Sequence, residues 1–249
     1  MKTTIKKTSA ALLLIIISAC LSAQQKELKV LFVGNSYTYN NNLPHIVAIL
    51  SENTGTKLIT RRSVAGGAWL WEHWNGKKGL ETREIIENGN FDIVILQDNS
   101  MSTLSAPDST LKYIRKFSAF NNEYGAKTYL FNTWAREKVP QFQETIDEVY
   151  AKGAEESGSV RVPVGAAWKL AMDLRPGVDL YNSDGSHPTQ LGTVLTAMMF
   201  VKAITGELPE RFPMDYKTTD FMGEEVVLLW MDPMDSEFCR RITEEVLDD

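Results

Sequence analysis

Two short segments of the chain carry residue types that together can perform acyl transfer. Ser36 follows directly on the apolar run "VLFVG" at 30–34, and His187 stands three residues after Asp184 in "YNSDGSHPTQLG". A serine becomes a useful nucleophile when a base takes its proton and a third group orients that base. Asp184 can fold back onto Nδ1 of His187 and leave the other ring nitrogen for the serine. Taken alone, however, "SDGSH" is more simply explained as a capping loop in front of a helix.

The chain around these residues alternates between apolar runs of strand length and stretches of helix length. We predict strands at 27–34, 57–65, 91–98, 126–134 and 160–165, and helices at 43–55, 108–124, 140–158, 166–174 and 189–206. Such alternation predicts βαβ units, which form a parallel sheet covered by helices on both faces. The expected fold is therefore α/β, a three-layer α/β/α sandwich around about five parallel strands. We expect a single domain over 27–249, with a C-terminal extension from about residue 207.

Ligands of parallel α/β sheets bind beyond the carboxyl ends of the strands. That rule marks the positions after the first four predicted strands, which are Ser36, the pair Gly66 and Gly67, the segment 97–100 and Trp134. Ser36 thus lies at the edge of the sheet where a site is expected. The strand before it would fix the serine at that edge.

The two segments together resemble the SGNH/GDSL hydrolase superfamily. "FVGNSYT" is similar to the nucleophile block of that family, with Asn35 where the usual motif has Asp, and "DGSH" is similar to its closing Asp-x-x-His block. The resemblance covers roughly 30–206 and implies a flavodoxin-like fold and a serine esterase that needs no cofactor. It also implies a catalytic triad of Ser36, His187 and Asp184. The G-x-S-x-G turn of the ordinary α/β-hydrolases is absent from the sequence.

The resemblance further implies an oxyanion hole, because acyl transfer needs fixed donors for the negative oxygen of the tetrahedral intermediate. In the family these donors are the N–H of the serine, a glycine N–H from a second block and a side-chain amide from a third. Gly66 matches the glycine best by its place after the second strand, and Gly67 is the alternative. The third block, "VILQDNS", departs from the usual Gly-x-Asn-Asp, so both Gln97 and Asn99 are candidates for the amide.

Aromatic side chains near the predicted strand ends indicate the class of substrate. We expect Tyr37, Trp69 and Trp134, together with Asn35 and His73, to line the substrate site. Aromatic faces suit sugar rings as well as acyl chains. In an acidic exported protein they favour a small acyl ester, acetyl in the first place, on a carbohydrate. A lipase or thioesterase of the same superfamily and a non-catalytic glycan-binding surface protein are the alternatives.

The first 23 residues have the features of a secretory signal rather than of the fold. Three lysines precede an apolar run at 10–19, and small residues follow it. We expect cleavage after Ala23 and export to the periplasm or beyond. The alternative is lipoprotein processing, since "ISAC" resembles a bacterial lipobox that would leave Cys20 as a lipidated N-terminus. Such a lipid anchor is the one membrane attachment that we expect.

Charge and composition exclude several classes of function. The formal net charge is −6, and it becomes −9 once the three lysines of the leader are removed, whereas nucleic-acid binding requires a basic surface. Without the leader, Cys239 is the only cysteine, so no disulfide can form within the chain. Three scattered histidines do not resemble a zinc site. The expected partner is therefore a small-molecule or glycan ester substrate, with no nucleic acid, metal or cofactor.

Overall fold

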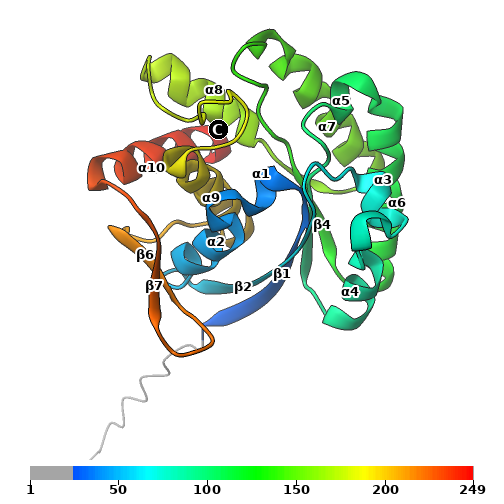
Figure 1. Cartoon of the computed structure of the whole chain (residues 1–249), viewed down its shortest axis with the longest axis horizontal. Coiled ribbons are helices and arrows are strands. Elements are labelled where there is room, and N and C mark those ends of the chain that lie inside the picture. The colour runs from blue at the N-terminus through cyan, green and yellow to red at the C-terminus, as the bar shows by residue number, and fades with distance from the viewer. Residues whose placement is uncertain (1–24, 249) are drawn as a thin grey trace, which may run out of the picture.

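The centre of the molecule is a five-stranded parallel sheet. In the computed structural model, which describes residues 25–248, the strands are ordered β2-β1-β3-β4-β5. Helices cover both faces of this sheet (Figure 1), and the predicted three-layer α/β/α sandwich is thereby confirmed. The order 2-1-3-4-5 is that of flavodoxin-like sheets. The predicted signal at 1–23 lies outside the described residues.

The elements follow the predicted alternation closely. The strands of the sheet are β1 (Lys26–Gly34), β2 (Thr56–Val64), β3 (Ile93–Leu96), β4 (Lys127–Phe131) and β5 (Val160–Val162). The helices of the two outer layers are α2 (Leu43–Ser51), α3 (Leu70–Trp74), α4 (Thr82–Gly89), α6 (Pro107–Glu123), α7 (Gln143–Ser157), α8 (Val164–Leu174) and α9 (Gln190–Thr205). Shorter segments are the helices α1 (Ser36–Tyr39) and α5 (Ser102–Ser105) and the 3₁₀ turns η1 (Asn40–Asn42), η2 (Lys77–Gly79) and η3 (Pro140–Phe142). The sequence pattern does not predict α1, α3, α4 or α5, because such short segments carry no sustained period.

Strand β1 shows how the sheet separates two hydrophobic layers. Val30 and Phe32 belong to the core that α2, α8 and α9 cover, whereas Leu31 and Val33 belong to the core that α3, α4, α6 and α7 cover. None of these four side chains has exposed surface. A strand that is buried on both faces has a continuous apolar sequence, which explains why "VLFV" is so readily recognised as a central strand.

Helix α9 is buried on nearly all sides. Its residues 192–201 are all buried, because α2, α8 and α10 (Pro233–Asp248) pack around it. Thr189 caps its N-terminus by accepting the Gly192 N–H at 3.2 Å, and Gly206 ends it in the left-handed conformation. The loop that precedes this helix is therefore attached to one of the most deeply buried elements of the fold.

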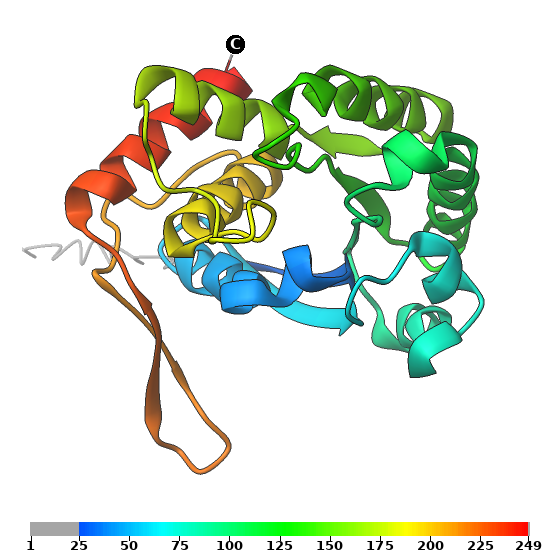
Figure 2. The same ribbon diagram turned by 45° about the horizontal axis from the view of Figure 1, so that its top comes forward.

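The C-terminal extension consists of α10 and an antiparallel hairpin. The strands of the hairpin are β6 (Asp215–Thr219) and β7 (Glu225–Trp230). Tyr216 and Leu229 of the hairpin and Phe238 of α10 belong to the same core as α9. The remainder of the hairpin projects away from the body of the molecule (Figure 2), with Phe221 96% exposed at its tip. No helix within 25–248 is long and apolar enough to cross a membrane.

Candidate active site

Ser36 follows the carboxyl end of β1, which is an interior strand of the sheet. The strand ends at Gly34, and Asn35 caps the helix that starts with Ser36, since Oδ1 of Asn35 accepts the Tyr37 N–H at 3.1 Å. Gly34 leaves room for this sharp turn, because a Cβ at that position would lie 2.3 Å from Oγ1 of Thr38. The turn therefore holds Ser36, half-buried, at the rim of the sheet.

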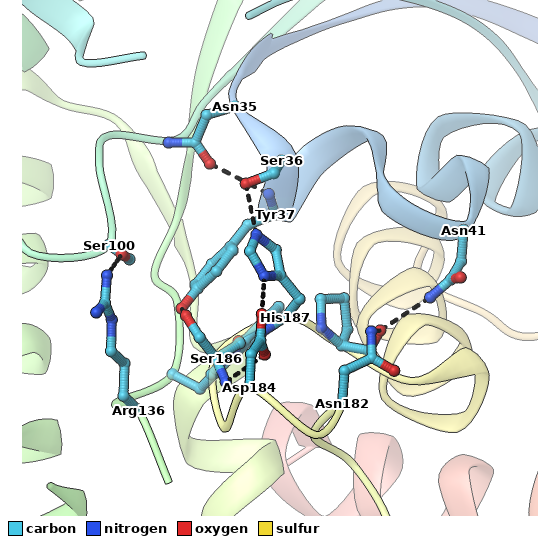
Figure 3. Close-up of polar contacts among 12 residues, drawn as sticks. Asn35, Ser36, Tyr37, Asn41, Ser100, Arg136, Asn182, Asp184, Ser186 and His187 are labelled. Carbon is cyan, nitrogen blue, oxygen red and sulfur yellow. Dashed lines mark hydrogen bonds and ion pairs between the residues drawn. The ribbon is translucent and has the colours of Figure 1, made fainter. Parts of the chain in front are cut away.

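The structure brings His187 to this serine from the loop before α9. Nε2 of His187 lies 2.8 Å from Oγ of Ser36, and Nδ1 lies 2.5 Å from Oδ2 of Asp184 (Figure 3). An ionised carboxylate only accepts hydrogen bonds, so Nδ1 carries a proton that it donates to Asp184, and Nε2 faces the serine hydroxyl. The three side chains form one line of hydrogen bonds, although Ser36 and His187 are 151 residues apart.

Both carboxylate oxygens of Asp184 are engaged in holding this loop. Oδ2 accepts the ring proton of His187, and Oδ1 accepts the backbone N–H groups of Ser186 and His187, each at 2.9 Å. These hydrogen bonds, with that from the His187 ring the largest cause, lower the pKa of Asp184 to about 2. The carboxylate is therefore ionised at neutral pH. Gly185 supplies the left-handed turn, with φ at +63°, that folds the backbone around it.

Stacked aromatic rings support the His187 loop. The ring of Tyr37 stacks on Trp134 with centroids 4.7 Å apart and meets the ring of His187 edge-on at 5.6 Å. Nε1 of Trp134 donates to the Ser186 carbonyl at 3.0 Å, and the Tyr37 hydroxyl lies 2.6 Å from Oγ of Ser186. Tyr37 and Trp134 are only 2% and 1% exposed. They pack beneath the imidazole rather than line the substrate site, which corrects the role predicted from their place near strand ends.

Two asparagines anchor the same loop from the other side. Nδ2 of Asn41 and Nδ2 of Asn182 both donate to the carbonyl of Pro188, at 2.9 and 3.0 Å (Figure 3). Asn41 also donates to Oγ1 of Thr193 on α9 at 2.9 Å. Since Pro188 directly follows His187, the imidazole is fixed between this polar anchor and the aromatic stack.

The loop after β2 lies against the residues that flank Ser36. Nδ2 of Asn35 donates to the carbonyl of Ala68 at 3.0 Å, and a Cβ at Gly66 would lie 3.7 Å from the Tyr39 hydroxyl. Within the described residues, neither the Ser36 N–H nor the Gly66 N–H has a hydrogen-bond partner. Both groups can therefore donate to an oxyanion.

Three successive carbonyl oxygens of this loop are held by side chains from three different segments. They are Gly66 O with Lys78 Nζ at 3.1 Å, Gly67 O with Asn99 Nδ2 at 3.1 Å, and Ala68 O with Asn35 Nδ2 at 3.0 Å. Gly67, the alternative glycine, adopts φ of +58°, where glycine is favoured. The loop is thus positioned before any ligand arrives, as a site for a developing charge requires.

Gln97 lies beneath the nucleophile turn. Its Oε1 accepts the Asn35 N–H at 2.9 Å and the hydroxyl of Thr38 at 3.0 Å, and its Nε2 donates to the carbonyl of Asp98. Gln97 has no exposed surface. It therefore stabilises the turn and does not reach substrate, which corrects its candidacy as the third oxyanion donor.

Asn99 is the amide that the structure places beside the glycine loop. One amide proton of Nδ2 is donated to Gly67 O, and Oδ1 accepts the Met101 N–H at 3.0 Å. The side chain is half-buried rather than enclosed, and its second amide proton has no partner among the described residues. Of the two predicted amides, Asn99 is the one that can donate to an oxyanion.

Of the three remaining predicted substrate contacts, Asn35 is 2% exposed and holds the neighbouring loops instead of lining the site, which corrects its predicted role. The other two, His73 and Trp69, differ in their exposure. His73 is 1% exposed, donates from Nε2 to Gly34 O at 3.0 Å and accepts the Thr82 hydroxyl at Nδ1, 2.7 Å away. Burial lowers the pKa of His73 to about 4, and this histidine supports the end of β1 instead of lining a pocket. Trp69 is half-buried beside the glycine loop, where its backbone N–H donates to Oε2 of Glu72 at 2.9 Å.

Asp98 is a structural residue of the site that the sequence pattern does not reveal. Its Oδ1 accepts the N–H groups of Leu70 and Asn99, each at 2.8 Å, and its Oδ2 accepts the Thr110 hydroxyl at 2.8 Å. Burial raises the pKa of Asp98. The carboxyl connects the loop after β3 with α3 and α6 and so positions Asn99. The available signal is an acidic residue at the end of an apolar strand.

The outer rim of the site is polar. Arg136, which is exposed in the loop after β4, donates to Oγ of Ser100 in the loop after β3 at 3.0 Å (Figure 3). In the described part of the chain, no group of three or more His, Cys, Asp or Glu side chains could hold a metal ion. The hydrogen bonds among Ser36, His187 and Asp184 can support nucleophilic attack by an activated serine, with the neighbouring N–H groups as fixed donors for the resulting negative charge.

Comparison with known proteins shows which family shares this fold. No protein-family model and no curated protein matches the chain. A solved structure from Slackia heliotrinireducens, assigned to the SGNH hydrolases, is 25% identical in sequence and has a TM-score of 0.62 over 73% of this chain and 100% of that one. The chain belongs to the SGNH hydrolase superfamily. The resemblance inferred from "FVGNSYT" and "DGSH" is thereby confirmed.

Other solved structures share the fold of this SGNH hydrolase. A DUF4886 family protein from Bacteroides uniformis is 17% identical, with a TM-score of 0.70 over 90% of this chain and 96% of that one. The psychrotrophic esterase EstA from a Pseudoalteromonas species is 10% identical, with a TM-score of 0.56 over 72% of this chain and 97% of that one. At these identities the two likenesses show a shared fold, and the support for a hydrolase comes from the Slackia structure.

Proposed function

We propose that this SGNH hydrolase is a serine esterase that removes a small acyl group from a carbohydrate or a related alcohol, with acetyl as the favoured acyl group. The observation that carries the proposal is the unbroken line of hydrogen bonds from Asp184 through His187 to Ser36. In this line Nδ1 of His187 faces the carboxylate and Nε2 faces the serine hydroxyl, which is the arrangement that general-base catalysis requires.

The proposed reaction has two steps. Oγ of Ser36 attacks the ester carbonyl while its proton passes to Nε2 of His187, and the same proton then goes to the departing alcohol as the C–O bond breaks. Water attacks the resulting acyl-serine, with His187 taking one proton from that water and returning it to Oγ. The products are the free alcohol and the carboxylic acid. Asp184 keeps the imidazole in the reactive tautomer and stabilises its cation.

The proposed oxyanion hole consists of donors that have no hydrogen-bond partner within residues 25–248. They are the N–H groups of Ser36 and Gly66 and the second amide proton of Asn99. Each such donor is typically worth about 10²–10³ in kcat. The proposal is supported by the carbonyl contacts described above, which hold the glycine loop without using these protons.

The surroundings of the triad favour a polar alcohol over a lipid. Ser100 and Arg136 form the exposed rim on one side, and Asn182 and Asp184 are exposed on the other. Sugar hydroxyls find donors and acceptors there, whereas a long acyl chain would require an apolar groove. The aromatic argument for a glycan is weaker than the sequence suggests, because Tyr37 and Trp134 are buried.

The direct test is hydrolysis of p-nitrophenyl esters of increasing acyl length by the protein without its leader. We expect turnover to be highest on acetate, and Ser36→Ala and His187→Ala each to lower kcat by about 10³-fold or more. Ser183→Ala is the matched control, because Ser183 is exposed on the same loop and makes no side-chain hydrogen bond in the described structure. Wild-type turnover in either triad variant would show that the assignment is wrong.

Two measurements on the same protein distinguish the competing functions, namely the preference for acyl-chain length and labelling by a serine-reactive probe. A strong preference for long acyl chains would favour a lipase or thioesterase. Labelling by a fluorophosphonate, lost in Ser36→Ala, would exclude a non-catalytic glycan-binding protein. Absence of labelling in folded protein, together with absence of ester hydrolysis, would favour that binding protein.

A further inference from the structure

A polar groove runs beside the His187 loop, on the side away from the aromatic stack. It has a volume of about 550 Å³ and lies between the segment 179–191 and the junction of β7 with α10. Its walls include Asn41, Asp179, Asn182, Gln190 and Trp230. The groove therefore exists only because the C-terminal extension packs next to the loop that carries the catalytic histidine.

The groove shares its inner wall with the catalytic site. Asn41 and Asn182, the two side chains that hold the Pro188 carbonyl, line the groove and lie on the same side of the His187 loop in Figure 3. Strand β7 contacts η1, the turn that directly follows the nucleophile helix α1. A chain-like ligand that presents an ester to Ser36 can therefore continue across these asparagines into the groove.

Trp230 gives the groove an aromatic surface that the core does not use. Its neighbours Leu229 and Met231 are 2% and 4% exposed, whereas Trp230 is 52% exposed. Within the described residues its indole N–H has no hydrogen-bond partner. A half-exposed indole with a free donor is suited to stack on the C–H face of a sugar ring while it donates to a hydroxyl.

Polar groups around this indole are also free. The carboxylate of Asp179 and the side-chain amide of Gln190 make no hydrogen bond in the described structure. By contrast, Asp232 accepts the Met234 N–H at 2.7 Å at the start of α10, and Asp235 pairs with Arg175 at 2.5 Å. An aromatic face with unpaired donors and acceptors is the composition that neutral, hydroxyl-rich ligands require.

We propose that this groove is a glycan subsite that binds the sugar residues next to the esterified one, with one ring stacked on Trp230. The inference rests on the proposed esterase function and specifies its substrate as an oligomeric carbohydrate rather than a single sugar or a small ester. Asp179 and Gln190 contact the hydroxyls of the stacked ring. The C-terminal extension thereby supplies substrate specificity without touching the reacting atoms.

The test compares a small ester with an oligosaccharide ester. Trp230→Ala is assayed on p-nitrophenyl acetate and on partially acetylated xylotetraose, chitotetraose and mannotetraose. We expect kcat/KM on p-nitrophenyl acetate to stay within about twofold, and KM on at least one oligosaccharide to rise roughly fivefold or more, since aromatic stacking contributes energy of this order. Gln190→Ala should raise the same KM to a smaller extent. Phe221→Ala, at the tip of the same hairpin, should change neither value.

Binding measured without turnover separates the two proposals. Ser36→Ala is titrated with the corresponding unacetylated tetrasaccharides by isothermal titration calorimetry, whose signal does not depend on the indole, and the titration is repeated with Trp230→Ala added. Binding that disappears with Trp230→Ala supports the subsite even if no ester hydrolysis is found. An active esterase whose oligosaccharide KM does not change in Trp230→Ala would overturn the subsite and leave the esterase intact. Failure of every tetrasaccharide to bind would overturn it as well.

Discussion

Replacing Asn35 by Asp changes one NH₂ group into an oxygen at a place where only a donor fits. Nδ2 of Asn35 faces the carbonyl of Ala68 at 3.0 Å and that of Asp98 at 3.4 Å, and the side chain is 2% exposed. The usual motif of the superfamily has Asp at this position. In this chain, however, the amide joins the loops after β1, β2 and β3, and a carboxylate would set a negative oxygen against two carbonyl oxygens.

The cost of Asn35→Asp follows from these contacts. Two lost hydrogen bonds are worth about 0.5–1.5 kcal/mol each, and a buried carboxylate facing acceptors adds about 1–3 kcal/mol. Because the contacts position the glycine loop and the loop of Asn99, we expect much of this energy to be lost from transition-state stabilisation. That predicts a fall in kcat/KM of about 30- to 1000-fold at pH 8, or about 2–4 kcal/mol.

The pH dependence distinguishes this reasoning from general damage. Burial raises the pKa of a carboxyl group, and a protonated carboxyl can donate to one of the two carbonyls. The ratio of variant to wild-type kcat/KM on p-nitrophenyl acetate should therefore rise as the pH is lowered from 8 to 5. Asn35→Ala, which cannot titrate, should give a constant ratio. Asn88→Asp on α4, an exposed position, is the control. Activity of Asn35→Asp within threefold of wild type at pH 8 would refute the assigned role.

Three further outcomes are expected. Asp184→Asn should lower kcat by about 10²–10⁴ through loss of the reactive tautomer, and a kcat near wild type would contradict the triad. Tm should fall only slightly, because the Asn side chain keeps an oxygen that can accept the backbone N–H groups of Ser186 and His187. Gly34→Ala should reduce both Tm and kcat, because its Cβ would lie 2.3 Å from Oγ1 of Thr38; an unchanged melting curve would contradict the tight turn. His73 has a folded pKa of about 4 against 6.5 unfolded, so its stabilisation is complete above pH 6.5 and declines as the pH falls towards 4. The loss is about 3 kcal/mol. Urea unfolding at pH 7.5 and 4.5 should show this loss in wild type and in the His45→Gln control, but much less of it in His73→Gln.

The sheet and the order of its elements are predictable because buried parallel strands have a simple sequence pattern. Continuous apolar runs such as "VLFV" occur where both faces are covered, and β1 with its two buried layers has that environment. Helices of four or five residues leave no such trace, which is why α1 and α3 are not predicted. The turn after β1 depends on Gly34 and Asn35, whose roles follow from contacts with distant segments.

Within the site, residue type and order along the chain locate Ser36, Asp184 and His187, but they do not distinguish a side chain that faces the substrate from one beneath it. Gln97 and Asn99 are two residues apart, and one is enclosed while the other is half-exposed. Tyr37 and Trp134 follow strand ends, yet their rings stack beneath the His187 loop. Orientation of this kind depends on long-range packing, which a local pattern does not encode.

The three carbonyl contacts of the glycine loop also bear on how the enzyme becomes active. Their donors are 12, 32 and 33 residues away along the chain, in η2, after β3 and after β1. Contacts between distant segments form only after the entropy of closing the intervening chain has been overcome. The loop can therefore reach its final position only when three neighbouring strands and the turn η2 are docked. During refolding, we expect esterase activity to return after helical circular dichroism has recovered, because the proposed oxyanion donors depend on these long-range contacts.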